Sequence, residues 1–153
     1  MTLHEEVELS RDELDVFLSS KETGVLSLAR GDDPYAIPIS YGYDRTNQWF
    51  YLRLVSTVAS EKRRYLASSP RARLVIYEDE DDKYDSVIVD GTLEERSKET
   101  LGVEDIVQYG AAKRPLFEMW GAEKPDLDVQ LYRLEPEEIS GRRIEVDRND
   151  AAV

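Results

Sequence analysis

The sequence of 153 residues has no cysteine and a single histidine, His4. Without cysteine the chain can form neither disulfides nor thiolate metal sites, and one histidine near the N-terminus cannot form a histidine cluster. The acidic run EDEDD at 78–82 lacks the glycine and the spacing of a calcium-binding loop. The sequence therefore predicts no metal centre.

Long apolar runs are also missing, and none approaches the roughly 18 to 20 residues that a transmembrane helix needs. The N-terminal stretch MTLHEEVELS lacks the basic and apolar blocks of a signal peptide. We expect a cytoplasmic protein. Its length suits one domain over residues 1–153, with a frayed C-terminal tail from about residue 147.

Positive charge is scarce, because 20 lysines and arginines stand against 33 aspartates and glutamates, and the formal net charge is -13. Such a charge repels nucleic acids and anionic membranes at long range, so we expect neither as the main partner. Arginine is commoner than lysine, and the acidic residues are spread along the chain. This composition is typical of an acidic protein from a halophilic host, in which hydrated carboxylates keep the surface soluble.

Periodicity predicts the order of the secondary-structure elements. Ser10 and Glu13 have the spacing of a capping box, which predicts a helix over 11–20. A strand over 24–31 and a turn at 32–33 follow. The later elements are strands over 35–44 and 49–55, a helix over 57–68, strands over 71–78 and 84–96, helices over 97–110 and 115–121, and strands over 128–136 and 137–146. This order favours an antiparallel β-barrel with peripheral helices, because the alternating βαβ units of a doubly wound fold are missing.

The segment YAIPISYGYD at 35–44 separates large from small side chains. One face would carry Tyr35, Ile37, Ile39, Tyr41 and Tyr43, and the other Ala36, Pro38, Ser40 and Gly42. Small residues let another backbone or a flat ligand approach closely, and tight sheet packing explains the same pattern equally well. Because Pro38 removes one ladder donor, we expect this strand to be bulged or at a sheet edge.

Basic residues gather in one stretch of this acidic chain. They are Lys62, Arg63, Arg64, Arg71 and Arg73. Solvated charge around a helix end is one interpretation, and an anionic ligand is the other. Ser60 and Lys62 at the start of the expected helix would suit a phosphate, and Arg53 at the end of the preceding strand could reach the same place.

Five short motifs, taken in order, resemble the pyridoxamine 5′-phosphate oxidase-like FMN-binding split barrels. The motifs are GVLSL at 24–28, DPYAIPISYGYD at 33–44, WFYL at 49–52, SEKRRYLASSPRARL at 60–74 and SVIVDG at 86–91. The resemblance implies a mostly β fold, a six-stranded antiparallel split barrel. It also implies a homodimer with FMN in clefts between the subunits and a flavin-dependent oxidoreductase of unknown substrate, in which the cofactor supplies most of the chemistry.

The resemblance implies a set of cofactor-binding residues as well. Ala36, Ile37, Pro38, Ile39, Ser40 and Tyr41 match the strand beside the flavin, Tyr51 and Leu52 match a second contact strand, Ser60 and Lys62 match the phosphate-binding element, and Ser86 matches a polar residue near the flavin. Arg53 is added as a further cation. Trp120 resembles an aromatic residue near the cleft, and a tryptophan buried in the core is an equal explanation.

Two departures from the family pattern limit the functional prediction. Vitamin B6 oxidases usually have arginines where this chain has Ala36 and Glu61, and their C-terminal Arg and His motif is not apparent, so we do not predict that activity. Arg53, Arg63 or Arg64 could substitute for the missing cations.

Other functions remain open on the same residues. A reductase that uses the deazaflavin F420 would explain the extra arginines through its longer phosphorylated tail. A non-catalytic carrier of flavin or haem, an interaction module, and RNA binding through the basic patch and its tyrosines are the remaining alternatives.

Overall fold

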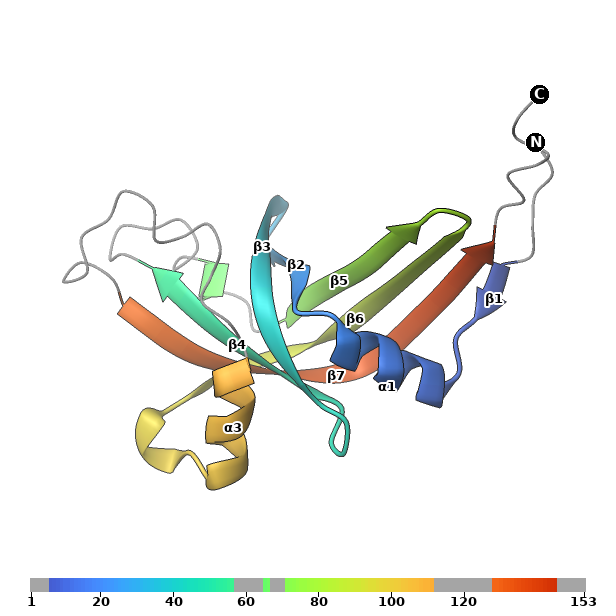
Figure 1. Cartoon of the computed structure of the whole chain (residues 1–153). Coiled ribbons are helices and arrows are strands. Elements are labelled where there is room, and N and C mark those ends of the chain that lie inside the picture. Colours follow the sequence, from blue (N-terminus) through green and yellow to red (C-terminus); the bar gives the residue numbers. More distant parts are fainter. Residues whose placement is uncertain (1–5, 57–64, 67–70, 112–127, 146–153) are drawn as a thin grey trace.

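The structure, a computed structural model, describes residues 6–56, 65–66, 71–111 and 128–145. Its strands pair antiparallel in the order β1-β7-β4-β3-β2-β5-β6, and β6 pairs back with β7, which closes the sheet into a ring (Figure 1). The ring contains β2 (Thr23–Arg30), β3 (Asp33–Asp44), β4 (Trp49–Ser56), β5 (Arg71–Glu80), β6 (Lys83–Arg96) and β7 (Asp128–Glu145). The prediction of a six-stranded antiparallel barrel is therefore confirmed. A short additional strand, β1 (Glu6–Glu8), pairs with β7 outside the ring.

The barrel interior is filled by one side of each strand, as the period of two in a strand requires. On β4, Phe50, Leu52 and Leu54 are at most 1% exposed, so this face of the strand is the core face. The other fully buried side chains include Leu26, Leu74, Ile76, Val87, Val89 and Leu134. Because the interior is apolar and filled, a ligand has to bind on the outward surface of the barrel.

Helix α1 (Arg11–Ser20) covers one opening of the barrel and confirms the predicted bounds. Its capping box is formed, since Glu13 N donates to Ser10 Oγ and Ser10 N donates to the Glu13 carboxylate. The Tyr41 hydroxyl donates to the carbonyl oxygen of Leu18 at 2.7 Å, and Leu14 packs against Gly141 of β7. These contacts attach α1 to both β3 and β7.

Helix α3 (Val103–Ala111) lies on the outward side of β3 and β4 (Figure 1). The predicted continuous helix over 97–110 is wrong, because a single 3₁₀ turn, η1 (Lys98–Thr100), comes first and the chain is extended at Leu101. Ser97 caps this short turn by accepting a hydrogen bond from Glu99 N. None of the described helices is long and apolar enough to span a bilayer.

Two further details differ from the sequence prediction, and a third agrees with it. The segments 128–136 and 137–146 are one continuous strand, β7, in which a register shift opposite Asp90 and Gly91 absorbs Glu137. The turn before β3 falls at 31–32 rather than 32–33, since Gly31 has a φ of 60° and takes the left-handed position. Pro38 lies without a bulge in the part of β3 that, among the described strands, pairs only with β2, which confirms the expected edge position.

The close contact between α3 and β3 depends on Gly42. A Cβ at this position would collide with the backbone carbonyl oxygen of Gln108, whereas a Cβ at Gly110 in the same helix would meet open space.

We predict that Gly42→Ala lowers the free energy of unfolding by about 1 to 3 kcal/mol, because α3 must shift outward. The matched variant Gly110→Ala should raise the free energy of unfolding, by up to about 1 kcal/mol, because alanine favours the helix. Urea unfolding of both variants checks this pair. Equal stability of the two variants would contradict the described packing of α3 on β3.

Candidate functional site

The small-residue face of β3 points outward and is divided into two halves. Ala36 and Pro38 are exposed, while Ser40 is 4% exposed and Gly42 lies under α3. The Oγ of Ser40 is buried and has no hydrogen-bond partner among the described residues. A buried hydroxyl without a partner is costly, so a polar ligand atom over this half of β3 would be favoured.

The exposed half of β3 continues sideways over β2 and β5 as two rows of outward side chains. The registers place Ser27 beside both Ala36 and Arg73, and Val25 beside both Pro38 and Val75. Neighbouring strands are about 4.8 Å apart, so each row crosses three strands within about 10 Å. The surface beside Ala36 is therefore low and flat up to the side chain of Arg73.

A cation lies just beyond the end of the pairing between β3 and β4. The pairing ends at Tyr41 and Leu52, and Ser40 and Arg53 are the next residue of each strand, on the outward face. Arg53 is half-buried, and within the described residues its side chain makes neither a hydrogen bond nor an ion pair. The structure thus brings together Ala36, Pro38, Ser40 and Arg53 on one surface.

The helix predicted over 57–68 is described only at Tyr65 and Leu66, which are helical. The ring of Tyr65 stacks on that of Tyr35 with centroids 5.1 Å apart and an interplanar angle of 18°. This stack places Tyr65 against the core side of β3, on the opposite face of the strand from the exposed Ala36. The predicted residues Ser60 and Lys62, the alternative cations Arg63 and Arg64, and Trp120 lie outside the described residues.

Other predicted site residues have their side chains elsewhere. Ile39, Tyr41 and Leu52 are at most 2% exposed in the core, so they could meet a ligand only through their backbone. Ile37 is half-buried and packs against the core. Ser86 is half-buried on β6, which two strands, β2 and β5, separate from β3 within one chain. The structure therefore does not bring Ser86 together with Ala36 in a single subunit.

Tyr51 belongs to a second cluster that the sequence did not reveal. Its side chain is 2% exposed under α3, its hydroxyl donates to Asp105 Oδ1 at 3.2 Å, and its ring meets Tyr109 edge-on with centroids 5.0 Å apart. Burial, the nearby Asp105 carboxylate and this hydrogen bond raise the pKa of Tyr51 to about 12. The i, i+4 spacing of Asp105 and Tyr109 was the signal that could have found this cluster.

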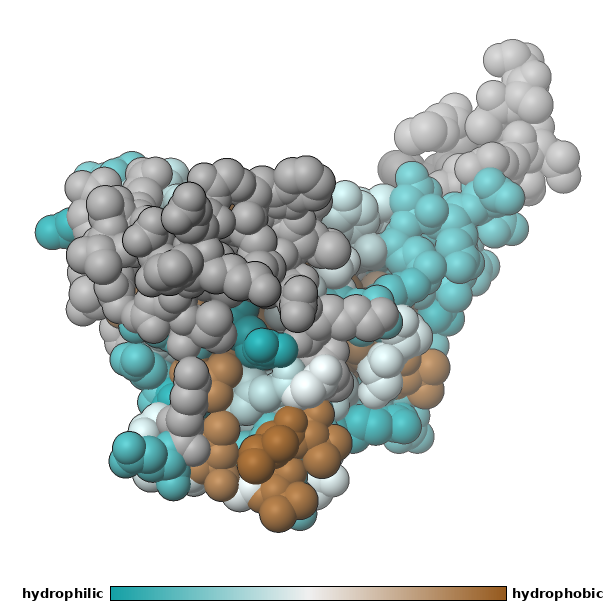
Figure 2. All heavy atoms as spheres, turned by 60° about the vertical axis from the view of Figure 1, so that its left-hand side comes forward, coloured by the Kyte–Doolittle hydropathy of each residue, from teal (hydrophilic) through white to brown (hydrophobic). Residues whose placement is uncertain are grey.

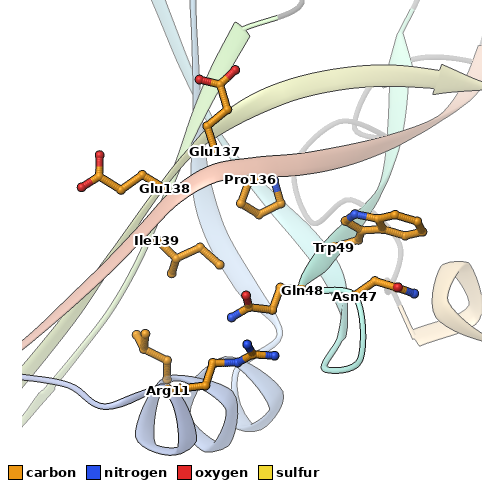
Figure 3. A pocket seen from close by; sticks show the side chains of 9 residues that line it. Arg11, Asn47, Gln48, Trp49, Pro136, Glu137, Glu138 and Ile139 are labelled. Carbon is orange, nitrogen blue, oxygen red and sulfur yellow. The ribbon is translucent and has the colours of Figure 1, made fainter.

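A separate pocket of about 330 Å³ lies between α1, the turn at 45–48 and β7 (Figure 3). Arg11 and Gln48 point into it, but the Arg11 guanidinium is already used, since it donates to Asp15 and to the carbonyl oxygen of Arg45. The ring of Trp49 is covered by Arg133, 3.9 Å from its centroid. None of the predicted site residues lines this pocket.

Within the described ranges, no three His, Asp or Glu side chains group in a way that could hold a metal ion. α3 exposes three apolar side chains, Val103, Ile106 and Val107, and Figure 2 shows apolar residues gathered on the side of the molecule to which α3 belongs.

Comparison with known proteins finds one matching family and several similar folds. Residues 10–143 match the protein family described as pyridoxamine 5′-phosphate oxidase. A search of curated proteins finds no match.

Similar folds occur among solved structures. An FAD-binding protein from Mesorhizobium loti has 22% identity and a TM-score of 0.69, with 93% of this chain and 98% of that chain covered. The FAD-binding protein from Mycobacterium smegmatis has 19% identity, a TM-score of 0.63 and coverages of 92% and 100%. A haem-binding protein from M. smegmatis has 20% identity, a TM-score of 0.61 and coverages of 87% and 54%. At these identities the likeness shows the fold alone.

The raised pKa of Tyr51 predicts how stability responds to alkaline pH. Since the unfolded chain ionises near pH 10 and the folded chain near pH 12, the stability that Tyr51 contributes is intact below pH 10 and is lost as the pH rises toward 12. In that window Tyr51 alone should reduce the free energy of unfolding by about 1.4 kcal/mol per pH unit. Urea unfolding at pH 9, 10 and 11 should therefore show a steeper loss for the natural sequence than for Tyr51→Phe. If the free energy of unfolding fell equally with pH in the two proteins, the buried and hydrogen-bonded environment described for Tyr51 would be wrong.

Proposed function

The chain belongs to the pyridoxamine 5′-phosphate oxidase family, and from this premise we propose that it binds FMN on the outward face of β3 and acts as a flavin-dependent oxidoreductase. The observation that carries the proposal is the surface formed by Ala36, Pro38, Ser40 and Arg53. Its exposed half is low enough for a flat ring, and its covered half holds a buried hydroxyl that lacks a partner.

These residues fit a flavin in shape and in chemistry. Ala36 and Pro38 leave the strand surface free for a planar ring system, because neither side chain projects far from the sheet. Ser40 can donate or accept one hydrogen bond, as a ring carbonyl or a ribityl hydroxyl requires. Arg53, which has no carboxylate partner among the described residues, supplies positive charge beside them for a phosphate.

A bound flavin would supply the hydride or electron transfer itself, and the protein would supply binding and orientation. Tyr51 contributes no general base at neutral pH, because its raised pKa keeps the hydroxyl protonated. Its hydrogen bond to Asp105 instead fixes α3 over the covered half of β3, so α3 limits how far a ligand can extend along the strand. Ser60 and Lys62 are proposed, together with Arg53, as the contacts of the ligand's phosphate.

We further propose that the protein is a homodimer in which the flavin lies between subunits. An outer apolar patch, made of Tyr77, Tyr84, Ile88 and Ile144, lies on the outward side of β5, β6 and β7, and these side chains are 37% to 58% exposed. Tyr77 and Tyr84 stack with centroids 6.2 Å apart. An exposed apolar patch is typical of an association surface. Ser86 borders this patch, so a second subunit could bring it toward the flavin.

Two alternatives use the same surface. F420 would place a longer phosphorylated tail over the sheet, and the two exposed arginines of β5, Arg71 and Arg73, favour it. A carrier of flavin or haem is the second alternative, favoured by the folds of the FAD-binding and haem-binding proteins. The absorption spectrum of the loaded protein distinguishes them, because FMN, F420 and haem have different visible bands.

Two substitutions test the cofactor proposal, because one should strengthen FMN binding and the other should weaken it. We predict that Ala36→Arg strengthens FMN binding by about tenfold, because position 36 lies at the end of the ring surface, where the added guanidinium would give the phosphate one charge-assisted hydrogen bond worth about 1.5 to 3 kcal/mol. Lys62→Glu should weaken FMN binding, because it places a carboxylate at the proposed phosphate site. Quenching of FMN fluorescence on titration measures both affinities, and Ser19→Arg, on the exposed side of α1, is the matched control. Failure of the natural protein to bind FMN, or no gain from Ala36→Arg, would refute the proposal.

The dimer proposal has its own test. Ile88→Asp should yield a monomer in light scattering at micromolar concentration, because a carboxylate in the outer apolar patch would be buried without a partner. Val16→Asp is the control, since Val16 is 61% exposed on α1, away from that patch, and this variant should remain dimeric. A natural protein that is monomeric under these conditions rules the proposal out.

A further inference from the structure

A cavity of about 390 Å³ opens on the outward face of the barrel between β2 and β5, beside the proposed flavin surface. Its walls include Ser27 and Ala29 from β2, Arg71 and Arg73 from β5, and Asp90 from β6. None of these residues belongs to the set that the family resemblance implies. The walls combine two guanidinium groups with a hydroxyl, which is the chemistry that binds oxyanions.

The two arginines are engaged to different extents. Arg71 donates to both carboxylate oxygens of Asp90, at 3.1 and 3.3 Å, and forms an ion pair with Glu137 at 3.3 Å. Among the described residues, the only carboxylate that Arg73 approaches is that of Asp90, at 4.0 Å, which is too long for a hydrogen bond. Its side chain is 66% exposed, so the donors of Arg73 remain available to a ligand.

Asp90 acts as an orienting group rather than as a full partner of Arg73. Its carboxylate accepts from Arg71 through both oxygens, and it stands across the β5–β6 ladder directly opposite Arg73. A solvent-exposed ion pair at 4.0 Å contributes little to stability. Stability of the sheet therefore does not explain why an arginine occupies this position.

The cavity lies on the strand next to the exposed half of β3. Ser27 is the cross-strand neighbour of both Ala36 and Arg73, so only a small side chain separates the cavity from β3. Two strand spacings amount to about 10 Å, which an extended ligand lying across the strands covers easily. Arg73 thus places a positive charge beside the exposed surface of β3. On that surface this chain has Ala36 where vitamin B6 oxidases usually have an arginine.

We propose that Arg73, with Ser27 and the oriented Arg71, forms an oxyanion subsite that binds a phosphate group of a ligand lying over β3. The guanidinium of Arg73 donates to the phosphate oxygens in the paired geometry that arginine favours, and Arg71 contributes charge without leaving Asp90. The phosphate belongs either to the bound flavin or to a separate anionic substrate. Only the first of these two sources rests on the proposed function.

The test uses three probes on the full chain at low salt: FMN, riboflavin and inorganic pyrophosphate. Flavin affinities come from fluorescence quenching, and pyrophosphate affinity comes from calorimetry together with amide chemical shifts of Ser27 and Arg73. The variant is Arg73→Gln, and the control is Arg45→Gln, which removes the same charge from the exposed turn after β3. Both substitutions are at exposed positions, so folding is preserved and is checked by the amide spectrum.

The subsite predicts that Arg73→Gln weakens pyrophosphate binding by about tenfold while Arg45→Gln does not. If FMN binding weakens equally and riboflavin binding is unchanged, the phosphate is that of the flavin. If FMN binding is unchanged, the phosphate belongs to a separate substrate. Unchanged affinity of Arg73→Gln for both FMN and pyrophosphate overturns the proposal. A natural protein that binds pyrophosphate through Arg73 but no flavin would refute the proposed function and leave the subsite standing.

Discussion

Closure of the sheet through β7 is the constraint on which the rest of the molecule depends. This single strand pairs with β4 through its first half and with β6 along most of its length, so no separate strand is needed to complete the ring. The register shift opposite Asp90 and Gly91 lets the strand bend as it passes from one neighbour to the other. Once the ring is closed, the alternation of side chains decides which residues form the core and which face outward.

The outward face is covered unevenly, and this unevenness creates the candidate site. α3 covers the parts of β3 and β4 that carry Gly42 and Tyr51, while the half of β3 that carries Ala36 and Pro38 stays exposed. Ser40 lies between the two regions, with a buried hydroxyl and no partner among the described residues. The shape of the site is thus set by where α3 ends, and its chemistry by a few side chains at that boundary.

Much of the fold could be predicted from the sequence because it depends on local signals. The capping box fixed α1, and alternation along 35–44 separated the core face of β3 from its outward face. The continuity of β7 was not predictable, because the predicted division between residues 136 and 137 is overridden by pairing with strands far away in the chain. The covering of Tyr51 by α3 was missed for the same reason, since it joins residues 54 positions apart. Arg73 was visible only as one of several basic residues until the register aligned it with Ser27 and Ala36.

The central claim, that a flavin lies on the exposed half of β3, is tested most directly by amide hydrogen exchange with and without FMN. Residues 33–40 pair only with β2 among the described strands, so their free amides should exchange readily without ligand. The account predicts that FMN slows exchange in this segment and leaves the turn at 45–48 unchanged. Protection confined to the pocket around Arg11 and Gln48, with none at 33–40, would contradict it.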